Sequence, residues 1–361
     1  MSFYEKIKSA LASEFIYSDD IARAVALAVE SGKNLLLWGP AGHGKSEMIQ
    51  RALSVVAADE DIFVQSFGEG MDEATLWGGL DFAALENEKV LRYFPEQSFL
   101  AKSYAVFEEL FDAPSSVLLG LKDTLTARVL RKGSQRFAMK TRVIIALTNK
   151  DPAEVSELGP AAHALIERFP IQMRVAWTSY TSQDYISLFG KVAPRLPGAD
   201  LNGTSRILAE MIAKAGEQGQ PISPRSAVHA LGVVKAAASL RGSAVVEKVD
   251  LLDLKFVDGM ENLAESLQKE IEAAAERAAA EGRVVEAERK LGTLLAGMEE
   301  AKKAQSPIKL LQSAKALAAF GDEAASLKVT DGLTDRRKRV RDSASEKAAE
   351  AQKLALENTR V

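Results

Sequence analysis

The first half of the chain alternates between short, continuous apolar runs and longer segments in which apolar residues recur at helical spacing. Such short apolar runs are typical of strands that are buried on both faces of a parallel sheet. Strands separated by helices form parallel βαβ units, so the pattern predicts a three-layer α/β domain over residues 1–178. The predicted strands cover residues 34–38, 62–65, 104–107, 143–147 and 171–176.

The strand pattern stops near residue 178, and only helical periodicity follows it. Helices without strands over residues 179–258 predict a small all-α domain after the α/β domain. The predicted helices of this domain cover residues 183–191, 205–214 and 224–240.

Beyond Asp258 the composition becomes rich in Ala, Glu, Lys and Arg. Apolar residues there follow the spacing of a coiled-coil seam, at Val284, Ala287, Leu291, Leu294 and Met298. Ser306 and Pro307 predict the start of a further helix and Gly321 its end. Two more helices are predicted over 334–340 and 343–357. We therefore expect a helical arm, with a possible coiled coil, over 259–361; the alternative is a loose, partly disordered tail.

The loop after the first predicted strand carries candidate chemistry. It satisfies the P-loop pattern G-x-x-x-x-G-K-[ST] and consists of Gly39, Pro40, Ala41, Gly42, His43, Gly44, Lys45 and Ser46. Backbone N–H groups of such a loop turn inward around a phosphate, assisted by the positive end of the following helix. Lys45 is expected to reach the β- and γ-phosphates, and the Ser46 hydroxyl to hold Mg²⁺. The loop predicts binding of a nucleoside triphosphate; the alternative is a structural glycine-rich turn.

Two later strand ends supply groups for hydrolysis. The apolar run 104–107 leads into Glu108 and Glu109. After a P-loop strand, this layout predicts that Glu108 faces the Mg²⁺ shell and that Glu109 orients or deprotonates the attacking water. The run 143–147 leads to Asn149, whose amide is expected to bond the γ-phosphate or the lytic water. The alternatives are solvated charge at a strand end and an ordinary turn asparagine.

Arg168 and Arg225 complete the set of candidate residues. Arg168 follows a helical segment that leads into the fifth predicted strand, and Arg225 lies in the first turn of a helix that Ser223 caps and Pro224 opens. An arginine at a helix start near a domain junction can reach the γ-phosphate of a nucleotide held by the large domain. The alternative for either residue is a solvated surface arginine.

Composition and charge exclude several classes of function. The 361 residues include no cysteine, which excludes disulfides, thiolate metal sites and cysteine nucleophiles. The formal net charge of -4 does not favour nucleic acid as the main partner. The first residues lack the apolar core of a signal peptide, and no apolar run approaches the length of a membrane span. We therefore expect a cytoplasmic protein without a membrane partner.

Taken in order, these motifs resemble AAA+ ATPases of the MoxR branch. The resemblance rests on the P-loop, the acidic strand end, Asn149, Glu167-Arg168-Phe169 and Ser223-Pro224-Arg225, and it covers about residues 15–245. The segment 72–79, Asp-Glu-Ala-Thr-Leu-Trp-Gly-Gly, is similar to an acidic and apolar segment of that family. The resemblance implies a P-loop AAA+ core with a lid domain, and ATP and Mg²⁺ as cofactors. By it, Asn149 is sensor 1, Arg168 the arginine finger and Arg225 sensor 2.

The resemblance also implies a function. Such a protein forms a homo-oligomeric ring, usually a hexamer, and couples ATP hydrolysis to remodelling or activation of a protein partner, commonly one with a von Willebrand A-type domain. Glu108 departs from the Asp that is usual in the family, which bears on Mg²⁺ coordination and hydrolysis. One alternative is a nucleic-acid motor or loader that uses the cationic run 336–341. Another is a non-hydrolysing, ATP-gated scaffold, suggested by Glu108 and the arm.

Overall fold

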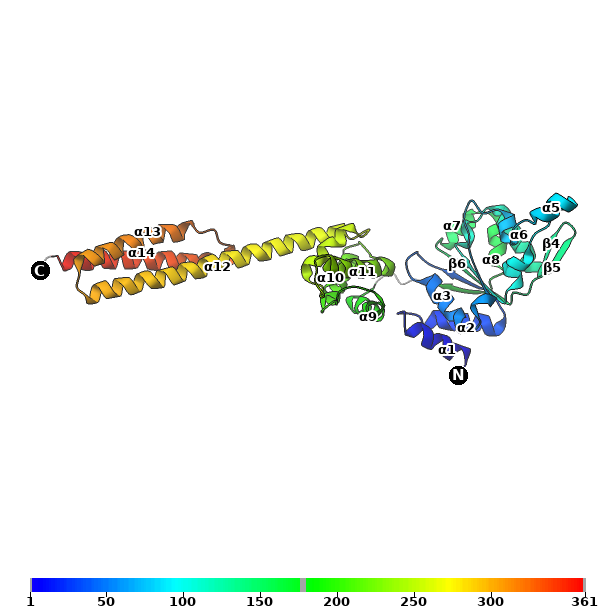
Figure 1. The fold of residues 1–361 in the computed structure, drawn as a ribbon, viewed down its shortest axis with the longest axis horizontal. Helices are drawn as coiled ribbons and strands as arrows, with labels where there is room; N and C mark the ends of the chain where they lie inside the picture. Colours follow the sequence, from blue (N-terminus) through cyan, green and yellow to red (C-terminus); the bar gives the residue numbers. More distant parts are fainter. Residues whose placement is uncertain (1, 176–179, 360–361) are drawn as a thin grey trace. The chain divides into compact units, whose positions relative to one another are not determined.

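The computed structural model describes residues 2–175 and 180–359, and the chain divides into two compact units, Met1–Ala264 and Glu265–Val361. Figure 1 shows the ribbon and labels most of the helices and some of the strands. The strands are β1 (Leu35–Trp38), β2 (Ile62–Ser66), β3 (Tyr104–Glu108), β4 (Val129–Lys132), β5 (Gln135–Ala138), β6 (Val143–Thr148) and β7 (Ile171–Arg174). The α-helices are α1 (Phe3–Ala12), α2 (Asp19–Ser31), α3 (Lys45–Ser54), α4 (Glu73–Leu76), α5 (Phe82–Glu88), α6 (Ser115–Ala127), α7 (Pro152–Glu157), α8 (Pro160–Ile166), α9 (Ser182–Val192), α10 (Thr204–Glu217), α11 (Pro224–Leu240), α12 (Glu261–Lys303), α13 (Pro307–Ser326) and α14 (Thr334–Glu357).

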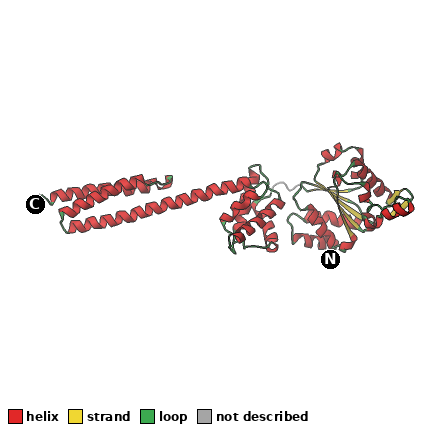
Figure 2. Cartoon of the chain, turned by 45° about the horizontal axis from the view of Figure 1, so that its top comes forward, coloured by secondary structure: helices red, strands yellow, loops and turns green. Residues whose placement is uncertain are grey.

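A five-stranded parallel sheet forms the centre of the first unit, in the order β2-β3-β6-β1-β7. Successive residues of β1 enter two different cores. Leu35 and Leu37 pack with residues of α1, α2 and α3, whereas Leu36 and Trp38 pack with residues of α6 and α8. Figure 2 shows the sheet with helices around it. The predicted three-layer α/β fold is confirmed, and the burial of both faces explains the continuous apolar runs.

Each of the five predicted strands is a strand of this sheet. The last predicted residue of the fifth, Ala176, lies outside the described residues. The sequence did not predict the antiparallel hairpin of β4 and β5, or the short helix α5, which lies between the bridge partners Leu80 and Tyr93. Both insertions are short and bury few apolar side chains, so their periodicity is weak.

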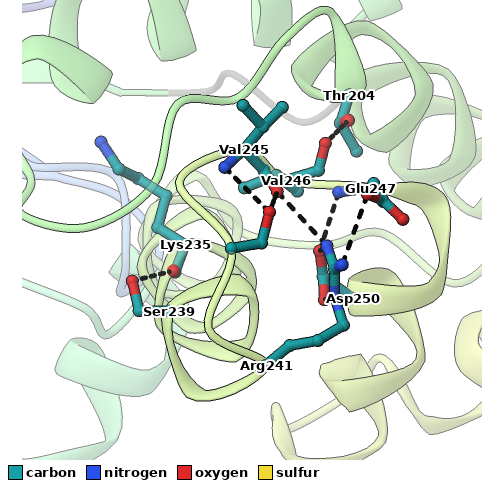
Figure 3. A network of polar contacts seen from close by, with 9 residues as sticks. Thr204, Lys235, Ser239, Arg241, Val245, Val246, Glu247 and Asp250 are labelled. Atoms are coloured by element: carbon teal, nitrogen blue, oxygen red, sulfur yellow. Dashed lines mark hydrogen bonds and ion pairs between the residues drawn. The ribbon is translucent and has the colours of Figure 1, made fainter.

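The helices α9, α10 and α11 follow in the same unit, and they contain the three predicted helical segments. Figure 3 shows the polar network that fastens the chain after α11. Arg241 Nε and Nη2 donate to the two carboxylate oxygens of Asp250, at 2.9 and 3.0 Å. The Glu247 N–H also donates to Asp250, at 2.7 Å. These bonds hold the pKa of Asp250 below its usual range, with the Arg241 hydrogen bond as the largest cause.

The second unit is a helical bundle that contains most of α12 and all of α13 and α14. The predicted seam residues Ala287, Leu291 and Met298 of α12 lie in one core with side chains of α13 and α14. The helical arm is therefore confirmed over the described residues, whereas the coiled-coil geometry remains a prediction. Among the described residues, none of the helices combines the length and the apolar character that a membrane span requires.

Two predicted boundaries in this unit are wrong. Gly321 does not end a helix, because α13 continues to Ser326. Gly321 is buried where α13 meets α14, and a Cβ added there would lie 3.2 Å from Ser345 Oγ. The two helices predicted over 334–340 and 343–357 are one, α14, since no helix-breaking residue separates them.

Candidate nucleotide-binding site

The P-loop joins the carboxyl end of β1 to the start of α3, as the motif requires. Other segments approach two of its positions so closely that a side chain does not fit there. A Cβ on Gly39 would lie 2.5 Å from the Val175 carbonyl oxygen. A Cβ on Gly42, at φ +80°, would lie 2.8 Å from Ser223 Oγ. Only glycine therefore fits both positions, and the loop is held between the sheet and the start of α11.

Lys45 is buried, with 7% of its surface exposed, and its ammonium group has three oxygen partners. Nζ donates to the carbonyls of Gly39 and Pro40, both at 2.7 Å, and to Asn149 Oδ1 at 2.8 Å. Burial lowers the pKa of Lys45 to about 8, and Glu109 partly opposes that change. An anion at this position, such as a phosphate, would replace neutral carbonyl partners and favour the charged ammonium.

Glu109 and Asn149 lie together at the carboxyl ends of β3 and β6. The Asn149 side-chain amide donates to Glu109 Oε1, and its backbone N–H donates to Glu109 Oε2 at 3.3 Å. Glu109 adopts a left-handed backbone conformation, with φ of +52°, which turns the chain at the end of β3. One amide side chain thus bonds both the P-loop lysine and the candidate general base.

A small cavity gathers most of the predicted residues. It is lined by Ala41, Gly42, His43, Gly44, Lys45, Ser46, Glu109, Leu147, Asn149 and Arg225. Arg225 enters from the first turn of α11, where its backbone N–H donates to the Gly42 carbonyl at 3.1 Å. The predicted cap is present too, because Ser223 Oγ accepts from the Ser226 N–H at 3.1 Å. The segment predicted as sensor 2 is therefore in direct contact with the P-loop.

Four of the predicted residues lie outside the lining of that cavity: Gly39, Pro40, Glu108 and Arg168. Gly39 and Pro40 still contact the site, because their carbonyls accept from Lys45 Nζ. Gln50 of α3 donates to the Glu108 carboxylate at 3.3 Å. Arg168 lies after α8, where its Nε donates to Thr126 Oγ1 at 2.8 Å. Asn34, just before β1, donates to the Arg168 carbonyl at 2.9 Å. Arg168 is therefore near the amino end of β1, whereas the P-loop follows the carboxyl end.

A larger cavity of about 380 Å³ adjoins the P-loop, and its lining was not predicted from the sequence. It shares Gly42, His43, Gly44 and Arg225 with the small cavity. Its other walls come from the loop after α1, from α3, and from α9 and α11: Glu14, Phe15, Ile16, Glu47, Met48, Tyr180, Leu188, Val192, Pro224, Val228 and His229. A mostly apolar space beside a phosphate loop suits the base and ribose of a nucleotide. The only sequence signal was the apolar pair Phe15-Ile16 between two helices.

An aromatic group stands between the P-loop and the α9 helix. The rings of His43 and Tyr180 are 6.1 Å apart, and Tyr180 also contacts Tyr17 and Tyr185, at 5.8 and 5.5 Å. Burial raises the pKa of Tyr185 to about 12 and also raises that of Tyr180, so both phenols stay neutral. The contact between His43 and Tyr180 therefore links the P-loop to the residues directly before α9.

The oxygen donors at the P-loop fit a hard cation. Among the described residues, no group of three or more His, Cys, Asp and Glu side chains could hold a metal ion by itself. Ser46 and Glu109 line the small cavity, and Glu108 is the last residue of β3, directly before Glu109. Magnesium commonly uses one or two protein oxygens together with substrate phosphates and water. The donor set therefore suits Mg²⁺ bound with a nucleotide rather than a closed protein site.

The sheet order, the P-loop after β1 and the helical domain that contacts the P-loop define a P-loop ATPase of the AAA+ class. A family model for the MoxR domain in the MoxR-vWA-beta-propeller ternary systems matches residues 3–189, just over half of the chain. The chain therefore belongs to the MoxR family of AAA+ ATPases.

Two further comparisons add little to this assignment. The solved structure of a predicted ATPase from Cytophaga hutchinsonii ATCC 33406 is 12% identical, and the match covers 74% of this chain and 94% of that one. The TM-score between the two structures is 0.40. A search of curated proteins found no match.

Proposed function

We propose that the protein is a ring-forming ATPase that couples ATP hydrolysis to remodelling or activation of a protein partner. One observation carries the proposal: Lys45, Ser46, Glu109, Asn149 and Arg225 line one cavity beside a larger, mostly apolar one. A lysine, a hydroxyl, a general base and an arginine around one space are the groups that γ-phosphate transfer to water requires.

Each residue of the cavity has a distinct role in this proposal. Lys45 binds the phosphate oxygens, and Ser46 with Glu108 would hold Mg²⁺, which would supply positive charge beside the phosphates. Glu109 accepts the proton of the attacking water once its hydrogen bonds to Asn149 have broken. Asn149 then bonds the γ-phosphate or that water. Arg225 contacts the γ-phosphate from α11, so hydrolysis changes how the helical domain is held against the P-loop.

Arg168 acts in trans in this proposal. It lies near the amino end of β1, away from the P-loop of its own chain, and it is about one-third exposed. An arginine supplied by a neighbouring subunit can raise the hydrolysis rate by about 10³–10⁵. A repeated head-to-tail contact that closes gives a ring, and a hexamer is the size that we propose.

The proposed partner is a protein with a von Willebrand A-type domain, since the matching family model is named for systems that contain one. Nucleic acid is less well supported, because several cations of the run 336–341 are bonded to other groups of the bundle. Arg336 there bonds Glu288 through two nitrogens, at 2.9 and 2.8 Å. Arg341 pairs with Asp342, and Arg337 donates to the Leu327 carbonyl.

Steady-state ATPase activity of the wild type and of Glu109→Gln tests the hydrolysis step. We expect turnover in the wild type and its loss in the variant, with ATP binding retained, because an amide cannot accept the proton. Light scattering with and without ATP should give rings for both proteins. Glu157→Gln, the same change at an exposed position on α7, serves as the control and should be fully active. Tight ATP binding without turnover in the wild type would contradict the proposal and favour a scaffold.

A further inference from the structure

The hairpin of β4 and β5 carries a cluster of positive charge. Residues 128–142 contain six Lys and Arg side chains and no Asp or Glu: Arg128, Arg131, Lys132, Arg136, Lys140 and Arg142. Two of these serve the fold, since Arg128 bonds the Thr141 carbonyl and Lys132 pairs with Glu73. The cluster contrasts with the net charge of -4 of the whole chain. The remaining cations are therefore a local feature that overall composition does not explain.

Arg131 and Arg136 are direct cross-strand partners in this hairpin. The Met139 N–H donates to the Arg128 carbonyl at 2.9 Å, which marks a hydrogen-bonded pair. The alternation of an antiparallel ladder then makes Arg131 and Arg136 a non-hydrogen-bonded pair, whose Cα atoms lie only about 4.5 Å apart. Like charges directly opposite each other destabilise a sheet. Within the described residues, neither side chain has a hydrogen bond or an ion pair that would offset this repulsion.

The two arginines face away from the protein core. The neighbouring cross-strand pair, Leu130 and Phe137, points to the opposite face, where Leu130 is fully buried. Side chains alternate along a strand, so Arg131 and Arg136 share the outer face with Val129 and Ala138. We call these four residues the hairpin face. It has a small apolar part, Val129 opposite Ala138, beside the two exposed guanidinium groups.

The segment that contains α5, residues 80–93, lies next to the hairpin and indicates the kind of partner that fits this surface. Gln135 ties the two insertions together, because its side chain accepts from the Tyr93 N–H at 2.8 Å and donates to the Tyr93 carbonyl at 3.3 Å. In that segment Phe82 is 71% exposed and Leu91 is 55% exposed. Exposed apolar side chains near unpaired arginines suit a protein surface.

We propose that the hairpin face docks an acidic segment of a protein partner. Carboxylates of that segment pair with Arg131 and Arg136, whose planar guanidinium groups bind carboxylates through two bonds. An apolar side chain between the carboxylates covers Val129 and Ala138. The cost of holding two arginines opposite each other is then offset in the complex. This inference does not depend on ATP hydrolysis.

Fluorescence anisotropy with a short, fluorescein-labelled peptide of alternating Glu and Val tests the proposal on the full-length protein. We expect Arg131→Ala/Arg136→Ala to weaken binding by about tenfold or more, because the carboxylates of the peptide lose their two arginine partners. The matched control is Lys338→Ala/Arg339→Ala, which removes two exposed cations from α14 and should bind like the wild type. The melting temperature of the hairpin variant should stay equal or rise, since the change removes a repulsion.

Either of two outcomes of the anisotropy measurement would overturn the proposal. Equal weakening by both double variants would show that the peptide responds only to general charge. Tighter binding of a labelled single-stranded DNA, lost in the hairpin variant, would assign the hairpin face to nucleic acid. A second measurement uses the absence of native cysteine: a fluorophore on Ala138→Cys should respond to the peptide, and an unchanged signal at saturating peptide would also overturn the assignment.

Discussion

Lys45 links the burial of the P-loop to the pH at which a nucleotide can bind. Its ammonium group is enclosed by neutral carbonyl and amide oxygens, and burial lowers its pKa from 10.5 to about 8. A bound phosphate raises the pKa again, because it places negative charge beside the ammonium. At a pH between the pKa of Lys45 in the free protein and its pKa in the complex, Lys45 is deprotonated in the free protein and protonated in the complex.

We therefore predict that ADP binding takes up a proton above about pH 8. The affinity should be constant below that pH and fall by up to about tenfold per pH unit above it. Isothermal titration calorimetry at pH 7 and pH 9, in buffers of different ionisation enthalpy, measures the uptake directly. Lys45→Arg keeps its charge and should show no uptake from this site. An affinity for ADP that does not change between these pH values would contradict the prediction.

The candidate site could be predicted from the sequence only in part, and the difference has a physical reason. Lys45, Glu109 and Asn149 follow neighbouring parallel strands, whose carboxyl ends meet at one edge, so a sequence motif can anticipate their meeting. The structure places them together with Arg225, while their roles remain predictions. The larger cavity draws residues from four separate segments, such as Phe15 and His229, and no local pattern connects these.

At the scale of elements, α13 shows how one helix separates buried from exposed positions. Leu317 is fully buried in the bundle core, whereas Leu311 on the same helix is 57% exposed. The two leucines have the same size and the same helix propensity, so their environments alone distinguish them. The pair therefore measures how much core packing contributes to the second unit.

We predict that Leu317→Ala destabilises the bundle by about 2–5 kcal/mol, because it removes apolar contacts and leaves a cavity. Leu311→Ala should change the stability by less than about 0.5 kcal/mol. Hydrogen exchange of the amides in α13 and α14 of the full-length protein reports the bundle separately from the first unit. Equal effects of the two substitutions would contradict the bundle packing described above.

The sequence failed to predict the β4–β5 hairpin and placed a helix end wrongly at Gly321, and each failure has a physical reason. The central strands were predicted because both faces are buried, which produces continuous apolar runs such as that of β6. The β4–β5 hairpin has one face turned outward, and Arg131 and Arg136 interrupt its apolar pattern. Gly321 resembled a helix end locally, but contact between α13 and α14 decides its position. In the case of Gly321, tertiary packing outweighs the local sequence signal.

For the molecule as a whole, we propose that each active site is completed by a neighbouring subunit. In one chain the P-loop follows the carboxyl end of β1, and Arg168 is bonded near the amino end of the same strand. A strand does not bend to bring its two ends together. We therefore propose that Arg168 contributes to hydrolysis at the P-loop of another copy.

Subunit mixing tests this claim most directly. Lys45→Ala subunits lack a working P-loop but retain Arg168, and Arg168→Ala subunits have the reverse defect. We predict that each variant alone is inactive, that Arg168→Ala still binds ATP, and that an equal mixture regains ATPase activity. Random assembly places an intact P-loop beside an intact Arg168 at about a quarter of the contacts, so about a quarter of the wild-type rate is expected. A mixture no more active than the sum of its parts would contradict the account.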